Sequence, residues 1–408
     1  MGTRFRFLPG LLVPVFLLGL NACKTSSSTT SSGTGALFVS TQGDSLVSAY
    51  TINLATGVLT ANGAGVATGT IPSAMLLAPS GSALFIVNSN PAITPTVPPT
   101  PCTLPDNPGS ISAYTVKSDG TLSPASGSAP AGLIPLAMAI DSGGHFLFVA
   151  NQGLQCKPDS GTISVFSIQD TTLTKVGSDV PVADPSAPSN PGPAGIAVTP
   201  DGKFLYVANQ FDGTVTGFSV DGSGVLTRGT TVTVGTAPTG MGVTPDGGFL
   251  YIANSGSSNV SAFAVCNQVV TSCSNPTSPD GTLTPLSGSP FSAGLGPTSI
   301  VAAPSGKFLF VVDRQSNQIS EYKLATGTGV LTANTQASIS TGGTPAGVTL
   351  RTGTTIVSTT QGTTDYLYVA NLGASTMTVF SFDSTVGVLG LVGSPVTTGG
   401  QPSAVAAK

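Results

Sequence analysis

The chain has 408 residues, with 52 Gly, 32 Pro and no Trp, and only 7% of its residues are charged. So few Glu, Lys and Arg residues argue against a protein with many surface helices and indicate an all-β chain with many turns. The net charge is −4 at pH 7, and beyond residue 23 the only arginines are Arg228, Arg314 and Arg351. Nucleic-acid binding needs a basic surface, so we expect no nucleic-acid partner.

The N-terminal residues 1–22 have the pattern of an export signal. Arg4 and Arg6 precede an apolar run, residues 7–20, that is too short to span a bilayer comfortably. The sequence LNAC that ends at Cys23 resembles a bacterial lipobox, which implies lipidation of Cys23; simple cleavage after Ala22 is the alternative. Residues 23–35 are Ser/Thr-rich and predict a flexible tether. We expect an exported protein, lipid-anchored at the cell envelope (periplasm or outer membrane), or otherwise secreted.

From Ala36 the chain repeats a unit of four strand-like segments. One unit, residues 193–234, reads PAGIAVTPDGKFLYVANQFDGTVTGFSVDGSGVLTRGTTVTV. Its second segment recurs at Ala36, Ala83, Phe146, Phe204, Phe249, Phe308 and Tyr366. The segments are rich in Val, Ile, Phe, Tyr and Thr and are bounded by Gly, Pro, Asp or Ser, which is typical of short strands joined by tight turns. In GTVTGFSV (213–220) apolar residues occupy both faces, so each sheet needs a neighbour on both sides.

Seven such units predict an all-β, seven-bladed β-propeller with four antiparallel strands per blade, over residues 36–408. The final segment, QPSAVAAK (401–408), matches the first segment of the other units, whereas the unit that starts at Ala36 lacks its own. The first segments of the other units begin at Pro72, Pro135, Pro193, Pro238, Pro297 and Pro345. We therefore predict that the C-terminal segment completes the first blade and closes the propeller.

The blade motif P-x-G-x-F-L-Y-V-A-N resembles the YVTN-type repeat. Over residues 36–408 the chain resembles the family of seven-bladed lactonases, which includes 6-phosphogluconolactonase-like and carboxymuconate-cyclase-like proteins. The resemblance implies lactone hydrolysis as one candidate activity. We expect no cofactor, and no spacing of ligating residues demands a metal ion.

Loops before the first strands and after the second strands should share one face of the propeller, here called the ligand face. A polar ring is predicted there from the last residues of the second segments: Asn88, Asn151, Asn209, Asn254, Asp313 and Asn371. These side chains could bind a ligand, but their recurrence in nearly every blade favours a structural role in the turn to the third strand. Asp313 with Arg314 breaks the pattern and is the best candidate for a functional pair. A simple surface ion pair is the alternative.

The other groups that a lactonase needs for base catalysis and substrate binding are not gathered on this face. The only histidine, His145, falls in a hairpin on the opposite face, and the only glutamate, Glu321, falls inside a third strand. Arg351 is expected in a long hairpin, residues 351–365, and Arg228 in an outer strand. Other charged residues expected in loops of the ligand face are Asp106, Lys157, Asp159, Asp184 and Asp212.

If Cys23 carries lipid, the remaining four cysteines can form two disulfides, with three possible pairings. Cys266 and Cys273 lie in one insertion and can close a short loop. Cys102 and Cys156 lie in insertions of adjacent ligand-face loops, residues 88–109 and 151–161, and are then left for each other. Such a bond would fix a proline-rich loop against its neighbour.

Three functions are compatible with these features. The main interpretation is an envelope propeller that binds or scaffolds a protein, a glycan or a small molecule on its ligand face, touches the membrane only through the lipid anchor and is a monomer. The first alternative is a lactonase-family hydrolase of a sugar-acid lactone. The second is a purely structural envelope protein. Because one fold supports many functions, the resemblance alone does not decide among them.

Overall fold

The described residues form short antiparallel strands grouped into seven sheets. The computed structural model describes residues 34–89, 107–186, 189–267, 280–334, 339–341, 356–361, 364–383 and 386–408. Within these ranges there is no helix with the length and apolar character to cross a membrane. The predicted signal peptide and most of the predicted tether lie outside them, and the first strand begins at Thr34, slightly before the predicted start.

The seven sheets are the blades of a propeller, numbered here along the chain. Blade 1 contains β33 (Pro402–Ala407), β1 (Thr34–Thr41), β2 (Leu46–Asn53), β3 (Leu59–Ala61) and β4 (Val66–Ala67). Blade 2 contains β5 (Pro72–Leu77), β6 (Ala83–Asn88), β7 (Pro108–Val116) and β8 (Leu122–Leu133). Blade 3 contains β9 (Pro135–Ile140), β10 (Phe146–Asn151), β11 (Thr162–Gln169), β12 (Thr172–Lys175) and β13 (Val180–Pro181). Blade 4 contains β14 (Pro193–Val198), β15 (Phe204–Asn209), β16 (Thr214–Val220) and β17 (Leu226–Thr233).

The other three blades follow the same order. Blade 5 contains β18 (Pro238–Val243), β19 (Phe249–Asn254), β20 (Asn259–Val265), β21 (Leu283–Pro285) and β22 (Phe291–Ser292). Blade 6 contains β23 (Pro297–Ala302), β24 (Phe308–Asp313), β25 (Gln318–Leu324), β26 (Leu331–Ala333) and β27 (Ile339–Ser340). Blade 7 contains β28 (Ile356–Gln361), β29 (Thr364–Asn371), β30 (Thr376–Asp383), β31 (Val388–Leu391) and β32 (Val396–Thr397).

Each blade is a meander of four antiparallel strands, as the repeat predicts. Where a fifth strand occurs, it is a second piece of the outermost strand: β3 and β4, for example, both pair with β2. Turn residues explain the meander. Between β14 and β15, Gly202 has a φ of 72°, and Thr199 Oγ1 accepts the N–H of Phe204 at 3.1 Å. The tight turn predicted between these two segments is confirmed, and its residues are Pro200, Asp201 and Gly202.

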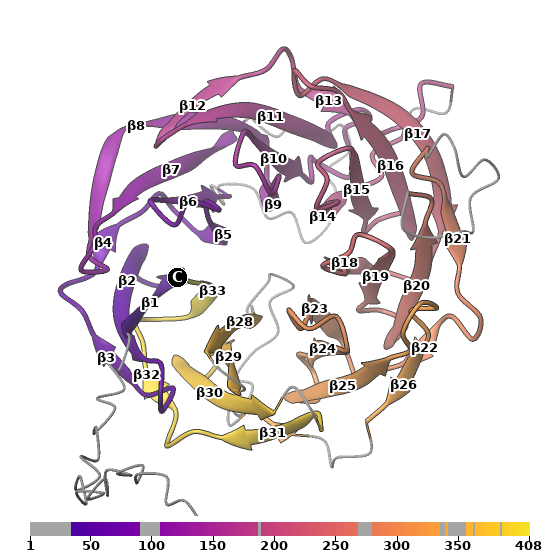
Figure 1. Ribbon diagram of the computed structural model, residues 1–408. Helices are drawn as coiled ribbons and strands as arrows, with labels where there is room; N and C mark the ends of the chain where they lie inside the picture. Colours follow the sequence, from indigo (N-terminus) through magenta and orange to yellow (C-terminus); the bar gives the residue numbers. More distant parts are fainter. Residues whose placement is uncertain are drawn as a thin grey trace, which may run out of the picture. The chain divides into compact units, whose positions relative to one another are not determined.

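The C-terminal strand β33 completes blade 1. It pairs antiparallel with β1, from Leu37 opposite Ala407 to Thr41 opposite Pro402. The first strands contact one another in the order β33, β5, β9, β14, β18, β23 and β28, and β28 contacts β33 again. Figure 1 shows the C-terminus beside β1 and β33. The predicted seven-bladed β-propeller and its closure are confirmed.

Apolar side chains pack between neighbouring blades. In β16, Val215 belongs to the cluster shared with blade 5, whereas Phe218 belongs to the cluster shared with blade 3. Both faces of the sheet are therefore buried, as the sequence pattern predicts. Burial of this kind is the main stabilising contribution in a fold whose described residues form strands and no helix to cover the blades.

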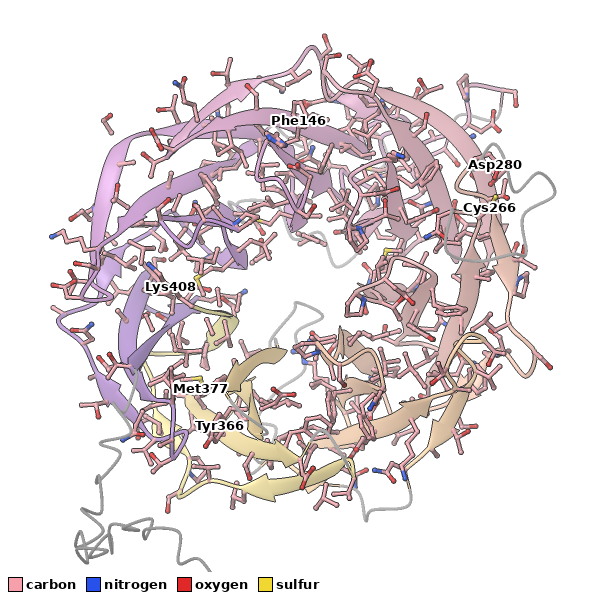
Figure 2. All side chains as sticks on the ribbon, in the orientation of Figure 1. Phe146, Cys266, Asp280, Tyr366, Met377 and Lys408 are labelled. Atoms are coloured by element: carbon pink, nitrogen blue, oxygen red, sulfur yellow. The ribbon has the colours of Figure 1, made fainter. Side chains whose placement is uncertain are left out.

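A second contact between blades involves an aromatic side chain and a glycine of the next blade. The pairs are Phe146 with Gly224, Phe204 with Gly281, Phe249 with Gly329, Phe308 with Gly387 and Tyr366 with Gly57. Every one of these glycines has a positive φ, and an added Cβ would lie 2.1–2.6 Å from a carbon of the aromatic ring. Figure 2 labels two of the aromatic residues, Phe146 and Tyr366. The contact requires glycine for its backbone angle and for its lack of a side chain.

Blade 7 departs from the sequence prediction. Residues 356–361, expected inside a long hairpin, form β28, the first strand of the blade, which pairs with β29 from Ile356 opposite Val369 to Gln361 opposite Thr364. The predicted first strand of this blade begins at Pro345, and that segment lies outside the described residues. Arg351 lies outside them as well. The run IVSTT is rich in β-branched residues, and only two residues separate β28 from β29, which suits a tight hairpin.

Two of the four candidate disulfide cysteines are described. Cys156 follows β10 and Cys266 follows β20, and each is disulfide-bonded. Cys102 and Cys273 lie outside the described residues, as does Cys23. The pairings Cys102–Cys156 and Cys266–Cys273 therefore stay predictions.

Candidate functional site

Six polar side chains end the second strands. Asn88, Asn151, Asn209, Asn254, Asp313 and Asn371 close β6, β10, β15, β19, β24 and β29, and none is more than 7% exposed. In blade 4, Asn209 Nδ2 donates to Thr214 Oγ1 and Thr216 Oγ1, both at 2.9 Å. The other four amides donate to the equivalent side chains of their third strands. These contacts support the structural interpretation, in which each amide joins the second strand to the third.

Asp313 differs because a carboxyl group replaces the amide. Ser320 Oγ donates to Asp313 Oδ2 at 2.6 Å, and Oδ1 has no hydrogen-bond partner among the described residues. Burial raises the pKa of Asp313 to about 6, against the opposite effect of hydrogen bonds from Ser320 and from the backbone N–H of Gly294. Arg314 is not among the groups that shift this pKa. A functional pair of Asp313 with Arg314 stays a prediction.

In blades 1 to 6, the residue that follows the second strand belongs to a second set, here called the rim. Its members are Gln42, Ser89, Gln152, Gln210, Ser255 and Arg314, whereas blade 7 has Leu372 at this position. Each donates its backbone N–H, at 2.8–3.0 Å, to the residue just before the first strand of its own blade. The acceptors are Gln401, Ile71, Ile134, Gly192, Ala237 and Gly296, all with φ between 48° and 72°. The rim therefore sits where the first strands begin, at the ligand face.

Arg314 is the only cation of the described rim. It is half-buried, and desolvation lowers the pKa of its guanidinium, but an arginine stays protonated in proteins. Sequence reasoning singled out Arg314 but missed the rim as a set. The available signal was weak: in the blades concerned a Gln, Ser or Arg follows the last residue of the second segment.

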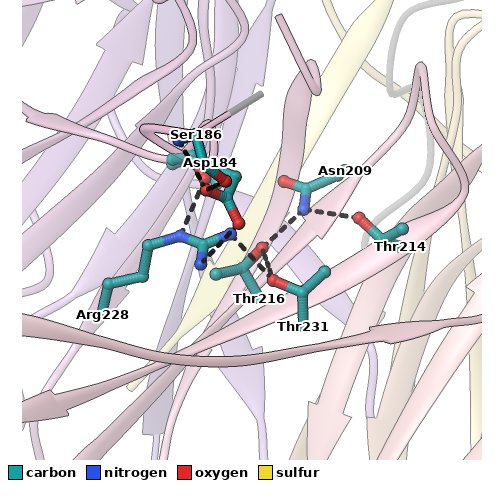
Figure 3. Close-up of polar contacts among 8 residues, drawn as sticks. Asp184, Ser186, Asn209, Thr214, Thr216, Arg228 and Thr231 are labelled. Carbon is teal, nitrogen blue, oxygen red and sulfur yellow. Dashed lines mark hydrogen bonds and ion pairs between the residues drawn. The ribbon is translucent and has the colours of Figure 1, made fainter. Parts of the chain in front are cut away.

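Arg228 lies on β17, the outermost strand of blade 4, as predicted. Its Nη2 donates to Thr231 Oγ1 at 2.9 Å, and its Nη1 lies 3.9 Å from Asp184 Oδ2 in the loop before β14. Thr231 contacts Thr216, which accepts from Asn209 (Figure 3). Arg228 is thus connected to the polar ring through side chains of its own blade and is not a rim residue.

His145 and Glu321 are away from the rim. His145 lies in the hairpin between β9 and β10, its side chain is 72% exposed, and Nδ1 is 3.0 Å from Asp141 Oδ2. Glu321 lies inside β25, where burial raises its pKa. Its Oε1 accepts from Asn334 Nδ2 at 2.8 Å, and the same amide donates to the carbonyl oxygen of Gly387 in blade 7. Glu321 lies inside a third strand, as predicted, and supports a contact between blades 6 and 7 through Asn334.

The remaining candidate charges are scattered. Lys157 and Asp159 lie between β10 and β11, and Asp212 lies between β15 and β16, all in loops that follow second strands. Asp106 lies outside the described residues. In the described part of the chain, no three His, Cys, Asp or Glu side chains gather closely enough to hold a metal ion.

Comparisons with known proteins agree with this architecture. The periplasmic gluconolactonase of Pseudomonas aeruginosa is 21% identical, with a TM-score of 0.69 over 91% of this chain and 98% of that chain. A candidate 6-phosphogluconolactonase from Bacteroides fragilis is 22% identical, with a TM-score of 0.68 over 93% and 99% of the two chains. These likenesses show the fold.

No curated protein matches the sequence significantly. The family model described as "Lactonase, 7-bladed beta-propeller" matches residues 157–272 and 273–407, which is more than half of the chain. The repeat, the closed propeller and this match agree, and the chain therefore belongs to the seven-bladed β-propeller lactonase family.

Proposed function

We propose that this protein hydrolyses a sugar-acid lactone at its ligand face. The family match supports this activity, and so do the structural neighbours, a gluconolactonase and a candidate 6-phosphogluconolactonase. Together they favour hydrolysis over the binding or scaffold role that was the main interpretation of the sequence. Within the chain, the proposal depends on one observation. The rim position that is Gln or Ser in five blades is a half-buried arginine, Arg314, in blade 6.

A guanidinium at this position suits the reaction. Water adds to the lactone carbonyl carbon, negative charge builds on the carbonyl oxygen, the ring C–O bond breaks, and a proton passes to the departing ring oxygen to give a hydroxy acid. A fixed positive donor lowers the energy of the oxyanion more than that of the neutral carbonyl. Partial burial of Arg314 strengthens this interaction because less water screens it. Asp313, buried at the end of β24, is a positioning residue for the segment that carries Arg314.

The test is lactone hydrolysis by the wild type and by Arg314→Gln, with gluconolactone and 6-phosphogluconolactone as substrates. Glutamine is the natural rim residue at positions 42, 152 and 210, so the variant should fold. We expect kcat/KM to fall about 10²–10³-fold, the usual effect of removing one oxyanion donor. Arg228→Gln on the outer strand is the matched control and should keep full activity. The proposal is wrong if Arg314→Gln hydrolyses both lactones like the wild type, or if the wild type hydrolyses neither.

We further propose that the protein works outside the cytoplasm. The lipobox-like sequence at Cys23 supports export and anchoring, and the Pseudomonas aeruginosa neighbour is a periplasmic enzyme. Replacing Cys23 by Ala should move the exported protein from the membrane fraction to the soluble fraction. An unchanged membrane fraction would contradict lipid anchoring through this cysteine.

A further inference from the structure

Two glutamines of the rim bond to each other across the boundary between blades 3 and 4. Gln152 Nε2 donates to Gln210 Oε1 at 2.6 Å. The other uncharged rim side chains bond to backbone instead: Gln42 to the carbonyl of Pro72, Ser89 to that of Pro135 and Ser255 to that of Ala237. The bond leaves Gln152 Oε1 and Gln210 Nε2 without a partner among the described residues. If both side-chain amides were turned around, one oxygen and one NH₂ group would still be left without a partner.

The backbone on both sides of the pair is held in place by Asn190. Its Nδ2 donates to the carbonyl oxygen of Gln152 at 3.0 Å, and its Oδ1 accepts the N–H of Gly192 at 2.9 Å. Gly192 in turn accepts the N–H of Gln210 at 2.8 Å. A separate apolar cluster packs beside these bonds, formed by Ile134, Leu136, Leu154 and Ala194. The two amides are therefore presented from a fixed base, which lowers the entropy cost of binding a ligand.

Phe211 follows Gln210 and is the only aromatic residue among the exposed large apolar side chains of the described residues, at 37% exposure. Its ring lies directly against Gly192, where an added Cβ would be 2.4 Å from a ring carbon. Its N–H donates to the carbonyl of Pro191 at 3.0 Å, so its backbone is also fixed. The result is a partly exposed aromatic ring packed on Gly192, the same residue that accepts the backbone N–H of Gln210.

We propose that Gln152, Gln210 and Phe211 form a subsite for the hydroxylated carbon chain of a sugar-derived lactone. An acceptor next to a donor matches neighbouring hydroxyl groups, each of which can accept and donate, and an aromatic face packs on the C–H groups between them. The three side chains are uncharged, so this subsite suits hydroxyl groups, whereas a phosphate would demand cations. The inference rests on the proposed lactonase activity and adds the chemical class of the substrate: a polyhydroxylated lactone that is not phosphorylated at this end.

The experiment compares two lactones, gluconolactone with its hydroxyl groups and δ-valerolactone without any. Gln152→Leu and Phe211→Ser should each lower kcat/KM for gluconolactone about tenfold, mainly through KM, and leave that for δ-valerolactone unchanged. Gln42→Leu, a rim glutamine that bonds only to backbone, is the matched control and should leave both values unchanged. Thermal unfolding of each variant checks that the propeller is intact. If folded Gln152→Leu and Phe211→Ser keep the wild-type ratio of the two kcat/KM values, the subsite is disproved.

A binding measurement separates this inference from the proposed activity. Gluconate, the ring-opened product, should give saturation-transfer NMR signals with the wild type and much weaker signals with Gln152→Leu. If the wild type hydrolyses no lactone but binds gluconate in this manner, the hydrolase proposal fails and the subsite stands. The opposite outcome is also possible: the wild type hydrolyses gluconolactone, but Gln152→Leu and Phe211→Ser change neither gluconate binding nor the ratio of the two kcat/KM values. In that case the hydrolase proposal stands and the subsite fails.

Discussion

At the scale of single residues, the backbone angle before each first strand is unusual. Four of the six acceptors of the rim N–H groups are not glycine: Gln401, Ile71, Ile134 and Ala237 have φ between 48° and 56°. A left-handed conformation costs a non-glycine residue about 1–2 kcal/mol. Repetition of this strain at the ligand face indicates that the rim geometry is maintained at some expense of stability, as is common near functional sites.

This strain predicts a stabilising substitution. Ala237→Gly should raise the free energy of unfolding by about 1 kcal/mol, because glycine adopts a positive φ without penalty. Blades 4 and 6 already carry Gly192 and Gly296 at this position. Ala302→Gly, in the extended strand β23, is the control and should destabilise by about 0.5–1 kcal/mol. Urea unfolding measures both, and a loss of stability in both variants would contradict the strain.

Because Asp313 is buried, we expect Asp313→Asn to change the free energy of unfolding by an amount that depends on pH. Burial raises its folded-state pKa from 3.8 to about 6, so the folded protein holds this proton more tightly than the unfolded chain. The stabilisation from the protonated carboxyl is therefore complete below about pH 4 and is lost as the pH rises through 6, a change of about 3 kcal/mol. Asp313→Asn should match the wild type at pH 4 and exceed its free energy of unfolding by up to about 3 kcal/mol at pH 8. Urea unfolding at the two pH values tests this, and an advantage of equal size at both would count against a titrating Asp313.

At the scale of elements, the contact of an aromatic side chain with a glycine of the next blade sets how closely blades approach. Phe308 is held by edge contacts with Phe382, at 5.1 Å between ring centroids, so it cannot easily move away from Gly387. An added Cβ at Gly387 would lie 2.1 Å from the Phe308 ring. The third-to-fourth strand hairpin of one blade is thus fitted to the second strand of its neighbour.

Gly387→Ala should lower the free energy of unfolding by about 3 kcal/mol, from the positive φ and the overlap with Phe308 together. Gly393 offers a matched control in the same blade, since its φ is 61° but nothing lies within 4 Å of an added Cβ. Gly393→Ala should cost about 1 kcal/mol from the backbone alone. Chemical unfolding of both variants gives the difference, and equal losses would show that the contact with Phe308 contributes nothing.

The elements also show what the sequence can and cannot predict. Strands and hairpins in blades 2 to 6 were predictable because turn residues such as Asp201 and Gly202 recur at fixed distances from β-branched runs. Blade 7 misled the prediction, because residues 345–352 match the first-segment pattern while the strand paired with β29 is Ile356–Gln361. The local sequence pattern cannot show which of two candidate segments forms the strand, because the choice depends on which of them pairs with β29.

The candidate site was predictable only in part. Asp313 and Arg314 were found because they break a repeated pattern, which one sequence displays by itself. The pair Gln152–Gln210 was missed, since a bond between residues 58 positions apart depends on how blades 3 and 4 pack. Phe211 was missed for the same reason, as only the structure places its ring against Gly192.

At the scale of the whole molecule, stability depends on one short strand. β33 contributes five buried residues, Pro402 to Ala406, and Ser403 Oγ lies 3.0 Å from Ser40 Oγ. It contacts β5 on one side and β28 on the other as well as pairing with β1. Without it, blade 1 would expose the backbone groups of β1 as an unpaired edge.

Deleting Gln401–Lys408 should therefore lower the free energy of unfolding by at least about 4 kcal/mol, because buried side chains of β1, β5 and β29 lose their partners together. Chemical unfolding of the truncated and full chains measures the loss. A synthetic peptide of residues 401–408, added to the truncated chain, should restore part of it, whereas the same peptide with Val405→Asp should not, since Val405 is 2% exposed. A truncated chain that unfolds at the same urea concentration as the full one would mean that the C-terminal strand does not close the propeller.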